Sequence, residues 1–184
     1  MTVRAAADSN YELFRVIASM PGIVVAEVGL ACVAIWREEV TDERFHLQRR
    51  GLAEVVGRYP KRAVFLCMVE QSSGPPSKRM RRASVQMVEE LSENLRCVAG
   101  VCEGDGILVT ISRTVMLWFV QLITRSNVPM EFFRDVPSAH HWLCKHTDMH
   151  PLETFMRTIE FIRTQLDVLE LRKRIELIED NVDP

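Results

Sequence analysis

The sequence lacks an uninterrupted hydrophobic run long enough to cross a bilayer. Its two longest apolar stretches, Ile23 to Trp36 and Ile107 to Ile123, are interrupted by Glu27 and Arg113. Both fall short of the roughly 20 apolar residues that a spanning helix needs. The first residues contain few basic side chains and no apolar segment of signal-peptide length. These absences exclude a membrane span and predict a cytoplasmic protein.

The sequence also lacks an excess of charge of one sign and any familiar catalytic signature. Its 23 Lys and Arg residues against 25 Asp and Glu residues give a formal net charge of −2. Such a chain has no overall attraction for nucleic acid or an anionic membrane. No loop carries a nucleotide-binding, nucleophile or metal-ligand motif, and the possible catalytic side chains Ser73, His141 and Asp105 have no sequence-level reason to converge. We therefore expect no enzymatic activity, no cofactor and no nucleic-acid partner.

Cysteine is present in an odd number that does not suggest a disulfide framework. Three of the five cysteines lie inside apolar runs at positions suited to a strand. Free cysteines commonly behave as small hydrophobic residues in cores. We interpret all five as reduced core residues: Cys32, Cys67, Cys97, Cys102 and Cys144.

Short apolar runs that alternate with helix-like segments are the main feature that the sequence does contain. Ala63 to Val69, Cys97 to Val101 and Met130 to Phe133 are each bounded by Gly, Pro or Asn. Before them, Leu13 to Ser19 and Ile23 to Trp36 read as antiparallel strands, with turns at Pro21-Gly22 and at Gly29. This order predicts an α/β fold with a mixed sheet of about 4–5 strands covered by helices.

Start and stop signals place the helices between these strands. Thr41 is an N-cap candidate followed by two acidic residues, and Ser77 is a second N-cap candidate after two prolines. The apolar stretch from residue 107 to 124 reads as a mostly buried helix, with a strand at its beginning as the alternative. A short helix is expected over Pro137 to Lys145. We predict a flexible N-terminus over residues 1–10 and an α/β domain over residues 11–147.

Residues 151–182 have the pattern of one long amphipathic helix. Two apolar seams overlap along it with steps of three and four residues, and charges of both signs flank the second seam. That pattern is typical of a helix that pairs with another helix, although packing of the helix on its own domain is the alternative. The predicted partner residues are Ile162, Leu166, Leu169, Leu171, Ile175 and Ile178.

A basic cluster at a predicted helix start is the second candidate for a binding surface. Cations are unfavourable at that end of a helix, whereas backbone N–H groups, hydroxyls and guanidinium groups together suit a phosphate or carboxylate. The alternative is a solvated face balanced by Glu70, Glu89 and Glu90. The candidate anion-binding or partner-binding residues are Ser72, Ser73, Ser77, Lys78, Arg79 and Arg82.

Histidines gather near residue 145 but do not form a persuasive metal motif. His140 and Cys144, like His146 and His150, are four residues apart, a spacing that can place two zinc ligands on one helical face. Pro151 interrupts a continuous helix, and no acid occupies the HExxH position. We therefore predict surface histidines at a helix end and no metal site.

Several of these segments together resemble the STAS fold, in particular its SpoIIAA-like bacterial branch. The matching parts are the strand RAVFLCMV, the GDG turn before a helix that contains Arg113, and FFRDVPSAHHWL, which fits F-x-D-x-x-x-A-x-x-W-L. The resemblance implies a regulatory or binding module without catalysis, in some members switched by a serine in a D-S-x-G-like motif and in others holding an apolar ligand. Here Gln71 stands where that motif has its acid, so the resemblance does not imply a phosphorylation switch.

The sequence thus predicts a non-catalytic regulatory or scaffolding module that assembles through its C-terminal helix, with itself as a homodimer or with another protein. A small-molecule or lipid-binding module is the alternative, with a pocket between the sheet and the 107–123 segment. That segment contains Met116, Trp118 and Phe119, which would equally serve as ordinary core.

Overall fold

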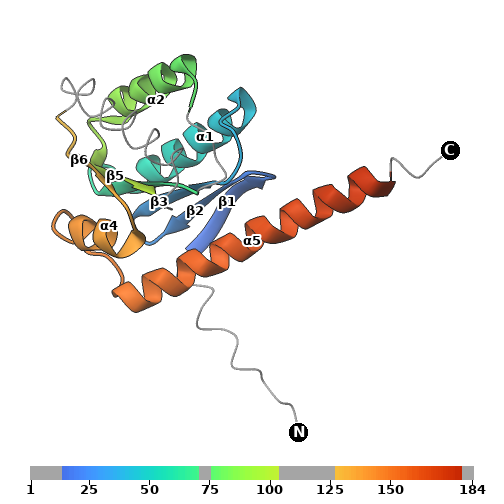
Figure 1. Cartoon of the computed structure of the whole chain (residues 1–184). Helices are drawn as coiled ribbons and strands as arrows, with labels where there is room; N and C mark the ends of the chain where they lie inside the picture. The colour runs from blue at the N-terminus through green and yellow to red at the C-terminus, as the bar shows by residue number, and fades with distance from the viewer. Residues whose placement is uncertain (1–13, 71–75, 104–126, 180–184) are drawn as a thin grey trace, which may run out of the picture.

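A six-stranded mixed sheet lies between two layers of helices (Figure 1). The structure is a computed structural model, and it describes residues 14–70, 76–103 and 127–179. The strands lie in chain order across the sheet. They are β1 (Phe14–Met20), β2 (Ile23–Val28), β3 (Ala31–Trp36), β4 (Ala63–Val69), β5 (Leu95–Cys102) and β6 (Met130–Phe133).

The predicted α/β class with a mixed sheet is confirmed, with six strands rather than four or five. The additional strand arises because the N-terminal segment forms three antiparallel strands. Gly22 and Gly29 adopt positive φ angles of 86° and 58° at the two turns, a conformation that glycine reaches without a steric penalty. From β3 to β6 neighbouring strands are parallel. The carboxyl ends of β3, β4, β5 and β6 therefore lie along one edge of the sheet.

In the described part of the chain, two helices cover each face of the sheet. The helices α1 (Asp42–Arg58) and α2 (Lys78–Leu91) pack on one face, and α4 (Val136–Leu143) and α5 (Leu152–Glu179) pack on the other. Along β2 the side chains alternate between the two layers: Val24 and Ala26 face α4 and α5, whereas Ile23 and Val25 face α1 and α2. Period-two alternation is what a sheet buried on both sides requires.

The helix starts follow the predicted capping. The Thr41 and Ser77 hydroxyl oxygens accept hydrogen bonds from the backbone N–H groups of Arg44 and Met80, at 3.4 and 3.2 Å. Asp135 caps α4 in the same way by accepting from the N–H of Ser138 at 2.7 Å. The predicted flexible residues 1–10 and the predicted helix over residues 107–124 lie outside the described residues.

Glu27 is an acidic residue within the otherwise apolar strand β2, and it is almost fully buried. Its carboxylate accepts hydrogen bonds from the guanidinium groups of Arg15 and Arg58, at 2.8 and 2.9 Å, and from the hydroxyl of Tyr59 at 2.8 Å. Burial by itself would raise the pKa of Glu27, but these hydrogen bonds and charges outweigh it and lower the pKa. Through these hydrogen bonds Glu27 links β2 to β1 and to the C-terminal end of α1.

The cysteines are free thiols, but only part of the prediction for them holds. Cys32, Cys97 and Cys102 are buried and Cys67 is half-buried. Burial raises the pKa of the Cys67 and Cys97 thiols to about 12. The prediction of a core position is wrong for Cys144, which is exposed because it lies at the C-terminal end of α4.

Candidate functional site

The helix α5 divides into a buried first half and an exposed second half. Phe155, Ile159, Ile162 and Leu166 are fully buried, and they pack with the sheet face of β1 and β2. Ile162 and Leu166 are therefore core residues and are unavailable to a partner, which corrects the prediction that both belong to the partner face. Their spacing of three and four residues marks a buried helix face as well as a coiled-coil seam, so the sequence pattern did not separate the two.

The second half of α5 leaves the sheet and extends away from the domain (Figure 1). Leu169 is half-buried, and beyond it the apolar side chains lie in solvent. Ile175 and Ile178 are 46% and 63% exposed. The exposed apolar side chains of this half are Val168, Leu171, Ile175, Leu177 and Ile178, and we call them the α5 seam.

Charged residues follow three parallel strands directly at the carboxyl edge of the sheet. Arg37 follows β3, Glu70 follows β4 and Glu103 follows β5. The strand registers place these three positions next to one another, because the last residues of the strands pair in sequence. The Nε of Arg37 donates to Glu70 Oε2 at 2.6 Å. In α/β folds this edge is the usual place for a ligand, but here it is occupied by ion pairs.

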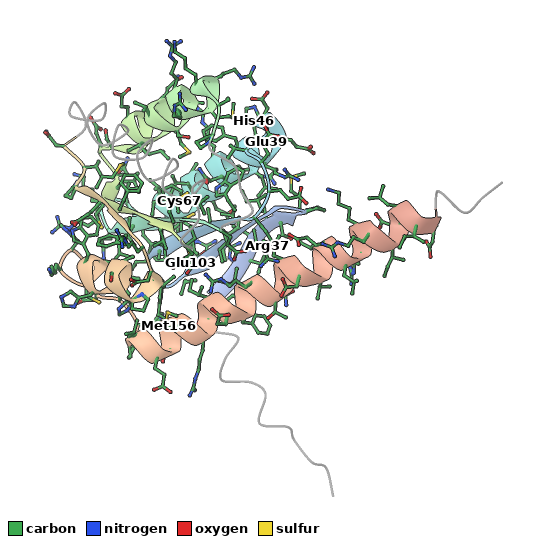
Figure 2. All side chains as sticks on the ribbon, in the orientation of Figure 1. Arg37, Glu39, His46, Cys67, Glu103 and Met156 are labelled. Atoms are coloured by element: carbon green, nitrogen blue, oxygen red, sulfur yellow. The ribbon has the colours of Figure 1, made fainter. Side chains whose placement is uncertain are left out.

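Residues from the middle of α5 complete this charged group. Arg37 also pairs with Asp167 and lies 3.6 Å from Glu170, while Arg163 pairs with Glu103 and its Nε lies 3.2 Å from Glu70. Figure 2 shows Arg37 and Glu103 between the sheet and α5. We call this group the strand-end network, and its members are Arg37, Glu70, Glu103, Arg163, Asp167 and Glu170. It fixes the direction in which α5 leaves the domain.

Electrostatics favour the charged form of both arginines. Burial alone would lower the pKa of Arg37, but its hydrogen bonds to Glu70 and Asp167 outweigh burial and raise the pKa above its ordinary value. The pKa of Arg163 is raised in the same way, since the carboxylate of Glu103 outweighs burial. The arrangement can therefore hold two permanent positive charges in a poorly solvated place.

The basic helix start is an exposed surface that is only partly open to a ligand. Ser77 caps α2, and Arg79 already forms an ion pair with Asp42 of α1. Lys78 and Arg82 are exposed, and no carboxylate among residues 14–70, 76–103 and 127–179 lies within ion-pair distance of either. Ser72 and Ser73 lie outside the described residues. The structure thus places the four described residues of this predicted site at the N-terminal end of α2: Ser77, Lys78, Arg79 and Arg82.

The histidine group is partly buried, which corrects the prediction of surface histidines. The ring of His140 is buried and packs at a tilt against the ring of Phe155, with 5.1 Å between the ring centroids. Its Nε2 lies 2.7 Å from the carbonyl oxygen of His150. Cys144 Sγ lies 3.7 Å from the Nδ1 of His140. In the described part of the chain, no three His, Cys, Asp or Glu side chains are grouped so that they could hold a metal ion. His140 thus holds the α4–α5 connection against the core.

Comparison with solved structures finds a match over part of the chain. The structure is similar to the crystal structure of an uncharacterized protein from the DUF3478 family, described as having a SpoIIAA-like fold, from Shewanella loihica PV-4. The TM-score is 0.47 at 17% sequence identity, and the alignment covers 69% of this chain and 98% of that chain. No protein-family model matches the sequence, and no curated protein matches it.

Sequence reasoning missed the strand-end network although a signal for it was present. Arg37, Glu70 and Glu103 are each the first charged residue after a buried apolar strand. Parallel strands bring such positions to one edge, so the three could have been grouped once the strands were assigned. The contribution of α5 could not be foreseen, because neither the helix sequence nor the strand sequences alone determine which helix residues meet the edge of the sheet.

Among the described helices, none is long and apolar enough to cross a membrane.

Proposed function

We propose that this protein is a non-catalytic interaction module that forms a homodimer through the α5 seam. The observation that carries the proposal is the row of exposed apolar side chains on a helix that has already left its own domain. An isolated helical segment of about 12 residues is marginally stable in water. Burial of its apolar face against a partner supplies the stability that the segment lacks by itself.

The charge pattern of the seam supports a second copy of the chain as the occupant. Val168, Leu171, Ile175 and Ile178 are spaced by three, four and three residues, as in a two-helix seam. An antiparallel pairing that sets Ile175 against Ile178 of a second copy brings Arg172 beside Glu179 of that copy, because both lie on the same flank of the seam. A two-fold symmetric dimer makes each such contact twice. The seam is thus complementary to itself in both apolar and charged positions.

The strand-end network supports the same function from within the domain. Because Arg37 and Arg163 tie the middle of α5 to β3, β4 and β5, the second half of the helix projects in a fixed direction. A partner helix then meets a preorganised surface and loses less conformational entropy on binding. The exposed Lys78 and Arg82 of α2 remain available in such a dimer for an acidic protein partner.

Paired substitutions test the apolar part of the proposal. Ile175→Ala together with Ile178→Ala removes apolar contact area while keeping a strong helix former. We expect the dimer dissociation constant, measured by sedimentation equilibrium, to rise by at least tenfold. The matched control is Leu152→Ala, because Leu152 is 41% exposed at the other end of the same helix. An equal effect of the control variant would contradict the proposal.

A charge exchange tests whether the partner is a second copy. Arg172→Glu sets two carboxylates, at positions 172 and 179 of the two copies, against each other and weakens the dimer. The combined variant Arg172→Glu with Glu179→Arg restores opposite charges and should recover the original dissociation constant. A different protein on this seam would not carry the compensating change, so failure of the exchange to restore binding would argue against self-association.

A further inference from the structure

A basic depression lies at the opposite end of the sheet from the strand-end network, at the amino ends of β4 and β5. Its cavity volume is about 430 Å³, which is within the range of small-molecule sites. Four cationic side chains line it: Lys61 and Arg62 before β4, Arg96 in β5, and Lys145 after α4. Among the described residues that line it, Asp148 is the one carboxylate. The depression thus carries a local charge of about +3 in a chain whose formal net charge is −2.

Within the described residues, none of the four cations of this depression forms an ion pair. Most other arginines that face the domain form ion pairs, such as Arg37 with Glu70. In contrast, across residues 14–70, 76–103 and 127–179 no carboxylate lies within ion-pair distance of any of these four cations. Like charges that are gathered without counter-charges repel one another. A bound anion would relieve that repulsion.

Two irregularities of the backbone direct cations toward the depression. The register of β4 against β5 jumps from Ala63 opposite Leu95 to Val64 opposite Cys97, so Arg96 is an extra, bulged residue. A bulge changes the direction of a side chain, and bulges are common beside functional sites. The Nε of Arg96 donates to the carbonyl oxygen of His146 at 3.0 Å, which orients its guanidinium group along the α4–α5 connection.

Lys61 is the second irregularity. Its φ angle of 64° makes it the one residue other than glycine with positive φ in the described part of the chain. A non-glycine residue in this conformation is strained, and it persists only where its surroundings hold it there. The backbone N–H of Lys61 donates to the carbonyl oxygen of Asn94 at 2.9 Å, so the loop before β4 is tied to the start of β5.

From this geometry we propose that the depression binds a small multivalent anion that carries a phosphate group. A local charge near +3 exceeds what one carboxylate neutralises, whereas a phosphate ester or a pyrophosphate group matches it. The guanidinium groups of Arg62 and Arg96 offer paired donors that fit phosphate oxygens, and Thr147 adds a hydroxyl at the rim. This site is separate from the α5 seam and from the basic start of α2, and it does not depend on the dimer.

Titration of the full chain with inorganic pyrophosphate tests this site. We expect saturable binding by calorimetry that weakens as ionic strength rises. Arg96→Gln should weaken binding by about tenfold or more, since it removes a charge-assisted hydrogen-bond donor. The control Arg50→Gln alters an exposed arginine of α1 and should leave binding unchanged. Equal loss in both variants, or no binding of pyrophosphate, would overturn the proposal.

Lys61→Gly separates the binding role from the folding role of the strained residue. Glycine adopts positive φ freely, so this variant should unfold at the same or a higher temperature while it binds pyrophosphate less tightly than the natural chain. Unchanged binding in Lys61→Gly would count against the site. Vesicles that contain phosphatidic acid distinguish the source of the phosphate: binding to such vesicles without binding to pyrophosphate would refute a small soluble ligand.

Discussion

Arg37 is predicted to be the residue that contributes most to the anchoring of α5, and Arg37→Gln tests this. The Arg37 side chain is 18% exposed, and it bridges Glu70 at the edge of the sheet to Asp167 on α5. Loss of one partner of a buried ion pair costs about 3–5 kcal/mol, because the remaining charge stays desolvated. Arg163 still lies close to Glu70 in the variant, so we expect a smaller loss of about 2–3 kcal/mol in the free energy of unfolding.

Chemical denaturation of the natural chain and of Arg37→Gln measures this loss of stability. The expected loss corresponds to a fall of about 4–12 °C in the unfolding temperature for a domain of this size. Hydrogen exchange should become faster in the middle of α5, around Asp167, before the sheet is affected. The matched control is Arg157→Gln. Arg157 also forms an ion pair on α5, with Glu153, but its side chain is 80% exposed.

Exposed pairs of this kind contribute about 0.3–0.5 kcal/mol. If Arg37→Gln destabilises the protein no more than Arg157→Gln, the strand-end network does not anchor the helix, and the account of how α5 is presented is refuted. A double-mutant cycle of Arg37→Gln with Asp167→Asn would then show no coupling energy between the two positions.

Three further predictions follow from the core. Glu27→Gln should lower the free energy of unfolding at pH 7 by about 1–3 kcal/mol. Because the pKa of Glu27 is lowered in the folded protein, its stabilisation is present above its unfolded pKa and is lost as the pH falls through the folded pKa. The stability curves of the natural chain and of the variant should therefore converge in acid. Alkylation followed by mass spectrometry should modify Cys144 first and Cys67 only after unfolding, since burial raises the pKa of the Cys67 thiol to about 12. Gly100→Ala should destabilise the protein by about 1–3 kcal/mol, since an added Cβ would lie 2.1 Å from the Phe132 ring; an unchanged unfolding temperature would contradict that contact.

Within the described residues, the sequence was sufficient for the order of the strands and helices but not for their contacts. Apolar runs with turn residues between them located the strands, and Thr41 and Ser77 marked helix starts correctly, because these signals are local. The antiparallel strands were also expected from the glycine turns. What a single segment cannot specify is which side of a long apolar helix meets its own sheet, and for that reason Ile162 was assigned to a partner surface although it is core.

The candidate sites also differ in how far the sequence predicts them, because some lie on one segment and others join several. The exposed seam around Ile175 was expected because its apolar residues are flanked by charges of both signs. The strand-end network and the basic depression were not expected, since each assembles residues from segments far apart in the chain. Arg96 in particular reads as one polar residue in an apolar strand, and only the register of β5 against β4 reveals it as a bulge.

The mass of the unaltered chain in solution tests the central claim most directly. Sedimentation equilibrium over a range of protein concentrations should detect a reversible transition from the 21.1 kDa chain to a species of twice that mass. A monomer at every concentration, with α5 protected from hydrogen exchange along its whole length, would contradict the account, because the exposed half of the helix would then be stable without a partner.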